Sequence, residues 1–508
     1  MINTTDLLQE NAQLKAQLHE KNHYIQQLEE ALLQARQRQF GASSEKLSPD
    51  QLGLFNEAEA QAEADSPKES IAESVTVKAH QRRVVQRVSI PADIPREIIV
   101  HDLPDNEKVC PHDGTPLKEI GSEQHEQLDI IPMQLKALVH QRKKYACRCC
   151  ERYVVTATKP KQPIEKSIAS PGLLAHIAVS KYADALPLYR LCEIFKRVGI
   201  DLDRTTLANW MIRCGELLQP LINLISEHIQ RQRVVHLDET TVQVLDEPGK
   251  TPQSQSYMWV MASYGDQTAI LFHYAASRSS SVPTLLLDSV DPEQRPAIMV
   301  DGYEGYQRVC SEQKLIRLGC WAHARRKFIE AQRLQPKGKT GKSDQVLAYI
   351  QQLYAIEREI RDKPVDERYN IRQLQAKPIV DKLKNWLDKT LQHTPPKTAL
   401  GKAVYYLHEQ WERLIRYLDD GNYPIDNNRI ENSIRPFAIG RKNWMFSNSQ
   451  AGAKASANLY SLVETAKANG LNPHDYLRWV FTQLPNAATV GEVEQLLPWE
   501  YHKRLTAG

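Results

Sequence analysis

The sequence predicts a multidomain α+β protein, in which an α/β core with a helical insertion is joined to a coiled coil, a cysteine-containing segment and a helical module. Length is the first reason, because 508 residues, 41% of them hydrophobic, can form several domains with substantial cores. The second reason is a group of β-rich runs between residues 233 and 320. The third is the helical periodicity at residues 7–35 and 334–418.

Residues 1–47 carry hydrophobic residues at alternating spacings of four and three, which predicts a coiled-coil helix. Asn11 would occupy a core position, where a buried polar residue fixes the register and favours two strands. We therefore expect a parallel homodimer or a higher oligomer, although the same face could instead pack on this chain or on another protein. One register contains Leu7, Leu14, Lys21, Leu28 and Ala35, and the other contains Asn11, Leu18, Ile25 and Leu32.

Residues 48–90 are predicted to form a flexible acidic linker. The segment from Asn56 to Ser74 contains six acidic residues and few large hydrophobic ones, so burial cannot offset the entropy lost on ordering. A plain spacer is the simplest interpretation. The alternative is that the acidic side chains mimic phosphates and lie against a basic patch of the same chain.

Residues 91–160 are predicted to form a zinc-ribbon-like domain with two knuckles, each a tight turn that presents tetrahedral ligands. The second knuckle has the required Cys-x-x-Cys spacing, but the first has Asp113 where a second cysteine is expected. Either Asp113 is an oxygen ligand, His112 replaces it, or the Zn²⁺ site is weak or empty. The candidate zinc ligands are Cys110, Asp113, Cys147 and Cys150.

Residues 161–228 are predicted to form a helical module whose centre resembles a helix-turn-helix. The turn at residues 199–203 ends on Asp203, which would cap the following helix and leave its amino end free to read base edges in DNA. A plain helical hairpin is the alternative, and in both cases Leu207 and Trp210 belong to the core. The expected helices are Pro171–Tyr182, Leu188–Arg197 and Arg204–Leu218, and the candidate base contacts are Arg204, Thr205, Thr206 and Asn209.

Residues 229–333 and 419–470 are predicted to form one α/β core. Apolar runs and alternating patterns predict three strands, followed by two further strands separated by helices. Three strands and then helix, strand, helix, strand and helix is the order of a ribonuclease-H-like fold. The strands are expected at 233–244, 257–262, 268–274, 297–303 and 315–320, with a helix at 279–287.

Three acidic residues stand out in this core. Asp238 lies in the middle of the first strand, and Asp301 stands at the end of a short buried strand. Glu431 lies on a later helix, which Asp426 or Asn427 would cap. Two Mg²⁺ or Mn²⁺ ions about 4 Å apart need a few convergent carboxylates, and such a pair promotes in-line displacement at a phosphodiester. We therefore expect Asp238, Asp301 and Glu431 to converge on a two-metal site.

Each of these acids has an acidic neighbour that could take its place. These neighbours are Glu239, Glu304 and Asp426. Strand alternation argues against Glu239, whose side chain would face the opposite side of the sheet.

Residues 334–418 separate Asp301 from Glu431 along the chain, and their periodicity predicts a helical insertion rather than a loop. Helices are expected at 346–361, 371–389 and 402–418. Such an insertion could contact DNA ends or another subunit. Residues 471–508 are expected to form a carboxy-terminal helical segment.

The net charge is only +3, but basic residues are concentrated in two segments. Residues 141–166 contain eight Lys or Arg against two Glu, and residues 314–342 contain nine against one. Such segments can neutralise phosphates, which predicts salt-dependent DNA binding, with solvated basic loops as the alternative. Trp444 could stack an unpaired base, although packing explains it equally well. The candidate DNA contacts are Lys143, Lys144, Arg325, Arg326, Arg441, Lys442 and Trp444.

Three strings in the carboxy-terminal half resemble a known family. They are GCWAHARRKF at 319–328, DNNRIEN at 426–432 and GRKNW at 440–444. They resemble the large transposase (transposase C) of the insertion sequence sixty-six family, and the similarity extends over nearly the whole chain, from residues 40–46 to 460–470.

This resemblance implies a DDE transposase whose triad is Asp238, Asp301 and Glu431. Such an enzyme binds the terminal inverted repeats of a bacterial insertion sequence, hydrolyses a phosphodiester with divalent metal, and transfers the strand into target DNA. Accessory proteins encoded by the same element are implied as partners. In several such enzymes a pattern like Cys320-x-x-His323 follows the fifth strand, where it could support the active site, or these could be a buried cysteine and an ordinary helical histidine.

Other classes of protein fit the sequence less well. The chain has no apolar stretch of about 18 residues and no signal-type amino terminus, so we expect no membrane partner and a cytoplasmic, nucleoid-associated protein. A dimeric zinc-containing helix-turn-helix repressor needs no three convergent acids. Another ribonuclease-H-like nuclease, such as a junction resolvase, would cut branched DNA without joining ends. The long block at 426–470 favours the transposase over both.

Overall fold

The computed structural model describes residues 134–146, 154–291, 296–335 and 341–506, together with residues 13–15, 17, 18, 21, 24, 25, 28, 96–99, 108, 115, 116 and 127. The chain divides into two compact units, Met1–Gln61 with Leu138–Gly508, and Ala62–Ala137. The described residues of the smaller unit lie outside helices, and every element named below belongs to the larger unit. Among the described residues, no helix combines the length and apolarity needed to cross a membrane.

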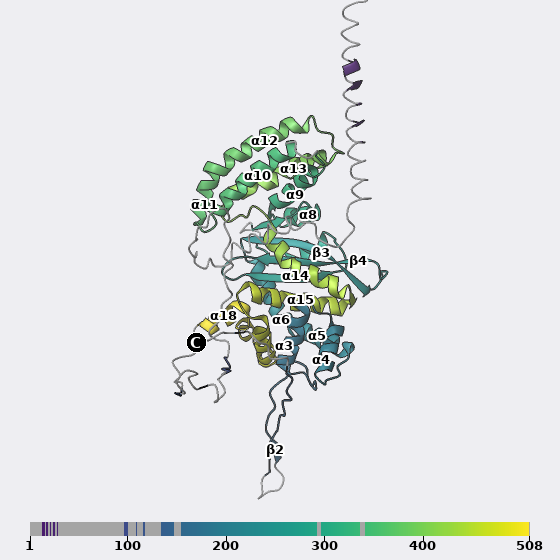
Figure 1. The fold of residues 1–508 in the computed structure, drawn as a ribbon, viewed down its shortest axis with the longest axis vertical. Coiled ribbons are helices and arrows are strands. Elements are labelled where there is room, and N and C mark those ends of the chain that lie inside the picture. The colour runs from purple at the N-terminus through teal and green to yellow at the C-terminus, as the bar shows by residue number, and fades with distance from the viewer. Residues whose placement is uncertain are drawn as a thin grey trace, which may run out of the picture. The chain divides into compact units, whose positions relative to one another are not determined.

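A mixed sheet forms the centre of the larger unit (Figure 1). Its order is β5-β4-β3-β6-β7, with β3–β4 and β4–β5 antiparallel and β3–β6 and β6–β7 parallel. The short strand β8 pairs with the far end of β3 and was not predicted, whereas the other five strands confirm the predictions. The bounds are β3 (Val234–Asp246), β4 (Gln255–Ser263), β5 (Ala269–Ala275), β6 (Ala297–Val300), β7 (Ile316–Gly319) and β8 (Ser447–Ser449).

The inner strand β6, which lies between β3 and β7, shows why the sequence folds in this way. All four of its residues, Ala-Ile-Met-Val, are buried, as expected of a parallel strand that is covered on both faces. The apolar run then ends on Asp301, which must follow the strand because a carboxylate cannot share that burial without a partner. The prediction that Asp301 stands at a strand end is confirmed.

Helices α14 (Asn428–Trp444) and α15 (Gln450–Ala468) cover the β3–β4–β5 part of the sheet. Two hydroxyl groups of α15 bind the outer strand β5. The amide of Ile270 donates to Thr465 Oγ1 (3.0 Å), and the amide of Phe272 donates to Ser461 Oγ (2.8 Å). The helix therefore satisfies backbone groups that a further strand would otherwise pair.

The amino-terminal helices pack against the carboxy-terminal ones. Helix α5 contacts α15, and α3 contacts α16. A Cβ on Gly215 of α5 would lie 2.6 Å from the Cα of Ala455, so only glycine permits this close approach. The three predicted helices are confirmed, and a fourth, α6, follows them. The bounds are α3 (Pro171–Tyr182), α4 (Leu188–Arg197), α5 (Arg204–Leu217), α6 (Gln219–Gln230), α16 (Pro473–Gln483), the 3₁₀ turn η5 (Leu484–Asn486), α17 (Val490–Glu494) and α18 (Pro498–Thr506).

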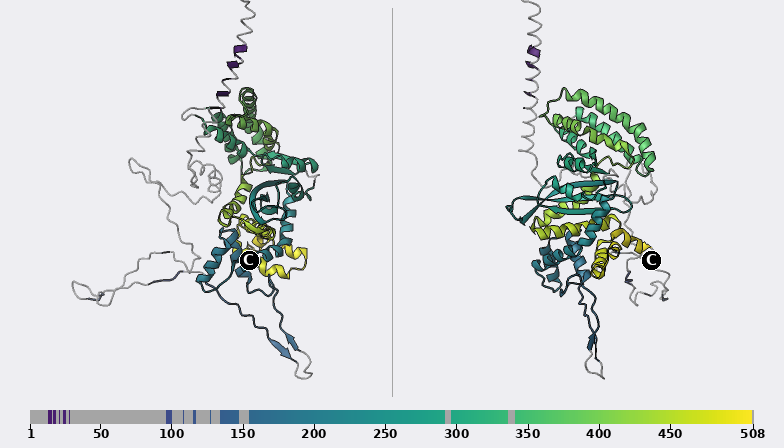
Figure 2. Two further views of the ribbon diagram at one scale, coloured as in Figure 1. Left: turned by 90° about the vertical axis from the view of Figure 1, so that its right-hand side faces the viewer. Right: turned by 180° about the vertical axis from the view of Figure 1, so that it is seen from behind.

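The segment at 334–418 is mainly helical in its described residues, as predicted, with turns at 361–364 and 392–398. In Figures 1 and 2 its helices gather on one side of the sheet, and α15 lies on the other. They share a hydrophobic core with β6, β7 and the helix α9, so the insertion packs directly on the sheet domain. The bounds are α9 (Trp321–Gln332), α10 (Lys342–Glu359), α11 (Val365–Ile371), the π-helix η3 (Arg372–Ala376), α12 (Lys377–Leu391), α13 (Ala399–Ile415) and the 3₁₀ turn η4 (Arg416–Asp419).

Two short helices complete the core, α7 (Ser281–Leu286) after β5 and α8 (Gly305–Glu312) after β6. The predicted helix at 279–287 corresponds to α7. The order strand, strand, strand, helix, strand, helix, strand and helix is thus present along the chain.

The amino-terminal predictions are only partly within the described residues. Strands β1 (Lys144–Ala146) and β2 (Val154–Thr156) pair as an antiparallel hairpin around the predicted second knuckle. The candidate zinc ligands Cys110, Asp113, Cys147 and Cys150 and the acidic linker lie outside the described residues. The described residues between 13 and 28 are helical, and Leu14, Leu18, Ile25 and Leu28 are exposed there. The coiled-coil oligomer and the domain limits stay predictions.

Candidate active site

Two of the three predicted acids lie at the same level of adjacent strands, Asp238 within β3 and Asp301 directly after β6. β3 and β6 are parallel, and His236 pairs with Met299. Asp238 comes two residues after His236, and Asp301 comes two residues after Met299. Glu431 lies in the first turn of α14, the helix that packs on β3. Three acids far apart in the sequence are thus held on neighbouring elements.

The ionisation of Asp238 shows that the acids interact. Burial raises the pKa of Asp238 well above its ordinary value. Negative charge on Glu239, Glu431 and Asp301 raises this pKa further, whereas the hydrogen bond from the amide of Glu239 to Asp238 Oδ1 (2.8 Å) lowers it. The site therefore concentrates negative charge that a cation would stabilise.

Arginines partly compensate this charge. Arg326 of α9 donates a hydrogen bond to Glu431 Oε2. Arg278 Nη2 lies 4.0 Å from Asp301 Oδ2, and its guanidinium stacks on the ring of Tyr303 at 3.9 Å from the centroid. The amide of Tyr303 in turn donates to Asp301 Oδ1 (2.9 Å). The two arginines thus place positive charge beside two of the acids.

The surroundings of Glu431 include an unpaired carboxylate oxygen. Oε1 of Glu431 and Nδ1 of His323 are 3.8 Å apart, and both are buried without a hydrogen-bond partner among the described residues. Burial, and then the charge of Arg326, lower the pKa of His323, whereas the charge of Glu431 raises it. Within the described residues, the donor atoms of Cys320, His323 and Glu431 all lie within 4.8 Å of one another, and Asp238 and Asp301 fall outside that group.

Asn427 joins the elements that carry the acids. This fully buried residue donates from Nδ2 to the carbonyl of Leu237 (2.9 Å), and its amide donates to Cys320 Sγ (3.2 Å). Burial lowers the pKa of His236 to about 4, so the ring is neutral and its Nδ1 donates to Asn427 Oδ1 (2.8 Å). One side chain therefore fixes the start of α14 relative to β3, and with it the positions of Glu431 and Asp238.

The acidic neighbours considered from the sequence all have other partners. Glu239 accepts from Tyr306 Oη (2.6 Å) and from Arg278 Nε (2.5 Å). Glu304 is 71% exposed and pairs with Arg413 at 3.3 Å.

Asp426 accepts from Tyr354 Oη (2.7 Å) and from the amide of Asn428 (3.1 Å), the first residue of α14. It therefore does the capping expected of Asp426 or Asn427, since the Asn427 side chain makes no capping bond.

The candidate DNA contacts fall into two groups. Asp203 caps α5 by accepting from the amides of Thr205 (2.8 Å) and Thr206 (3.1 Å), as predicted, and Leu207 and Trp210 are buried. The exposed candidates are Lys143, Lys144, Arg204, Thr205, Asn209 and Lys442, and the half-buried ones are Thr206 and Arg325.

The second group is engaged within the protein. Arg326 binds Glu431, and Arg441 donates to Thr240 Oγ1 (3.2 Å) and Thr241 Oγ1 (3.0 Å) of β3. Trp444 packs edge-on against Phe437, with ring centroids 5.5 Å apart, which supports the packing alternative for this residue.

Sequence reasoning missed Arg278 and Asn427, and it assigned Arg326 to DNA alone. Arg278 stands in a loop without any motif, so no local signal marks it. Asn427 lies inside the DNNRIEN string, where it was considered only as a helix cap. The basic helix at 321–332 carries Arg326 one turn after His323, a spacing that places both on one face toward the same partner.

Four family models match this chain. The model of the Transposase IS66 family matches residues 166–455, and the IS66 C-terminal element matches 461–499. The zinc-finger binding domain of transposase IS66 matches 107–151, and the model described as Transposase C of IS166 homeodomain matches 27–99.

Relatives in Sinorhizobium fredii are similar over most of their length. The uncharacterized protein y4jD is 34% identical over 428 residues, which are 81% of each chain. The uncharacterized protein y4qI is 31% identical over 520 residues, covering 97% of this chain and 92% of that relative. Because the family model spans more than half of the chain, this protein belongs to the IS66 family of transposases.

Proposed function

We propose that the protein is a DDE transposase with a ribonuclease-H-like catalytic core, in which Asp238, Asp301 and Glu431 hold two divalent metal ions, Mg²⁺ or Mn²⁺. The observation that carries the proposal is the placement of Asp238 and Asp301 at one level of two adjacent parallel strands, with Glu431 on the helix that packs there. The strand order β5-β4-β3-β6-β7 and membership of the family support it.

The residues fit hard divalent cations. The three acids offer oxygen donors, and Glu431 Oε1 is buried without a hydrogen-bond partner among the described residues. Burial, and then the negative charges of Glu239, Glu431 and Asp301, raise the pKa of Asp238. Metal ions bound there would activate the attacking water or 3′-hydroxyl and stabilise the leaving oxygen. The neighbouring side chains have separate tasks: Asn427 sets the spacing between β3 and α14, and Arg326 orients the Glu431 carboxylate.

DNA recognition is assigned to other parts of the chain. We infer that α5, with Arg204, Thr205, Thr206 and Asn209, reads bases at the terminal inverted repeats, because Asp203 leaves this end of the helix ordered and exposed. The basic residues Lys143, Lys144 and Lys442 would bind phosphates. With chromosomal DNA as its substrate, the protein would act at the nucleoid.

Reconstitution tests this function. Purified full-length protein is incubated with DNA that carries the ends of its own element and with a target plasmid, with Mg²⁺ or with EDTA, and with or without the accessory proteins of the element. We expect cleavage and joining only with Mg²⁺. Sedimentation of the same complexes tests the predicted homodimer or higher oligomer. End binding without Mg²⁺-dependent cleavage, both with and without the accessory proteins, would indicate a repressor. Mg²⁺-dependent cleavage without joining would indicate another ribonuclease-H-like nuclease, such as a resolvase.

We further propose that Cys110, Asp113, Cys147 and Cys150 bind Zn²⁺, supported by the zinc-finger match at 107–151 and by the β1–β2 hairpin that flanks the second pair. The full-length protein should contain about one zinc per chain. Cys147→Ser should lose this metal, whereas Cys192→Ser, a change at a free cysteine in α4, should keep it. Metal analysis by mass spectrometry measures both, and zinc-free wild-type protein would refute the site.

A further inference from the structure

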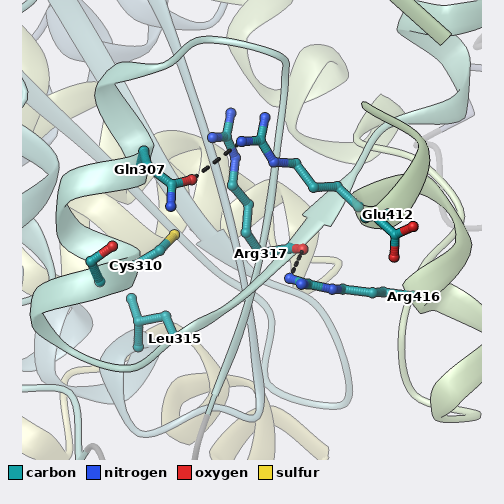
Figure 3. Close-up of a pocket in the computed structure, with 8 residues that line it drawn as sticks. Gln307, Cys310, Leu315, Arg317, Glu412 and Arg416 are labelled. Carbon is teal, nitrogen blue, oxygen red and sulfur yellow. Dashed lines mark hydrogen bonds between the residues drawn. The ribbon is translucent and has the colours of Figure 1, made fainter. Parts of the chain in front are cut away.

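A cavity of about 330 Å³ lies between α8, β7 and α13 (Figure 3). Figure 3 shows Gln307, Cys310 and Leu315 on one side and Glu412 and Arg416 on the other, with Arg317 between them. The cavity is separate from the acids of the candidate active site. It is lined by Gln307, Cys310, Ser311, Leu315, Arg317, Glu412, Arg413 and Arg416.

The buried arginine in this cavity has unused hydrogen-bond donors. Arg317 is only 2% exposed, and its Nη2 donates to the carbonyls of Asp301 (3.1 Å) and Tyr303 (2.8 Å). Its Nε and Nη1 are buried and have no hydrogen-bond partner among the described residues. Burying a guanidinium with two unpaired N–H donors costs free energy. An acceptor that bonded to these donors would therefore stabilise the folded protein.

Two further arginines add positive charge to the same cavity. Arg413 bonds to Gln410 Oε1 (3.0 Å) and Gln307 Oε1 (3.2 Å), and it pairs with the exposed carboxylate of Glu304. Arg416 donates to the carbonyl of Arg317 (3.0 Å), and its positive charge also lowers the pKa of Asp419, which burial raises. Glu412 is the acidic residue in the lining, so the arginines outnumber it.

The surroundings of Arg317 also change the pKa of its guanidinium. Burial, and then the positive charge of Arg413, lower the pKa of Arg317 from its ordinary value. A guanidinium stays protonated at neutral pH even so. The like charges therefore repel one another, and an anion placed between them would reduce this repulsion.

We propose that this cavity binds a phosphate group, held by Arg317 Nε and Nη1 with Arg413 and Arg416 around it. Guanidinium groups bind phosphate oxygens through paired charge-assisted hydrogen bonds, and three of them match an ion with more than one negative charge. The phosphate can belong to a phosphodiester of a bound DNA strand or to a free phosphate ion. Because Arg317 Nη2 binds the carbonyl of Asp301, an occupied cavity would also hold the strand end that carries this acid.

The test compares variants of the full-length protein in EDTA at constant ionic strength, so that it does not depend on cleavage. Arg317→Gln and Arg416→Gln remove charge from the cavity. Arg308→Gln is the matched control, because Arg308 lies on α8, one of the elements beside the cavity, but is 59% exposed and pairs with Glu312 outside the cavity. One arm measures the Kd of inorganic phosphate by calorimetry, and the other measures the Kd of a short single-stranded oligonucleotide without terminal phosphates.

Phosphate binding to wild type and Arg308→Gln that weakens about tenfold or more in Arg416→Gln and Arg317→Gln supports the proposal with a free ion as the ligand. The same loss seen only with the oligonucleotide supports it with a phosphodiester as the ligand. If Arg317→Gln fails to fold, Arg416→Gln decides alone. Equal affinities among wild type, Arg416→Gln and Arg308→Gln in both arms overturn the proposal, whatever the outcome of the cleavage assay.

Discussion

Asp238→Asn, Asp301→Asn and Glu431→Gln should each lower Mg²⁺-dependent cleavage and joining by at least about 1000-fold, because a metal-bound site contributes several kcal/mol to the transition state. Binding of the element's ends should remain largely intact, since the proposed DNA contacts lie on other residues. Single-turnover cleavage of labelled end DNA gives the rate, and a filter-binding assay gives the affinity.

Asp246→Asn is the matched control for this series. Asp246 is an exposed acid at the far end of the same strand, β3, so its change should leave the rate unaltered. Strand transfer that persists in one of the three active-site variants would remove that residue from the metal-binding set. In that event the acidic neighbour of that position, Glu239, Glu304 or Asp426, becomes the next residue to test.

Asn427→Ala should lower the free energy of unfolding by about 2–6 kcal/mol. The change leaves two buried groups unpaired, His236 Nδ1 and the carbonyl of Leu237, and each unsatisfied group costs about 1–3 kcal/mol. Urea denaturation followed by tryptophan fluorescence measures the loss.

Asn443→Ala provides the comparison for Asn427. Asn443 is exposed and makes one hydrogen bond, to the carbonyl of Ala185 (3.1 Å), so its loss should change stability by no more than about 0.5 kcal/mol. If both variants unfold at the same urea concentration, Asn427 does not connect β3 and α14 in the way its contacts indicate.

The sequence predicted the strands and helices of the core because each has a strong local pattern. The run Ala-Ile-Met-Val before Asp301 marks a buried strand and its end without any knowledge of the rest of the chain. β8 was missed because three polar residues, Ser-Asn-Ser, carry no periodicity and form a strand only beside the end of β3.

The contacts within the candidate site were harder to predict. The bond between Arg326 and Glu431 spans 105 positions, and that between Asn427 and His236 spans 191. Such contacts depend on how elements pack, which spacing along one segment does not specify. The acids could be selected by residue type and strand position, whereas the side chains that hold them could be found only from the folded arrangement.

The hydrogen bonds that β5 makes to the Ser461 and Thr465 hydroxyls of α15 affect how readily the protein aggregates at high concentration. An outer strand with open amides is a template for pairing with another molecule and hence for aggregation. In this protein a helix from the same chain occupies the amides of Ile270 and Phe272, so that edge is blunted. At high concentration, copies of the protein are therefore protected against pairing of their sheets edge to edge at β5.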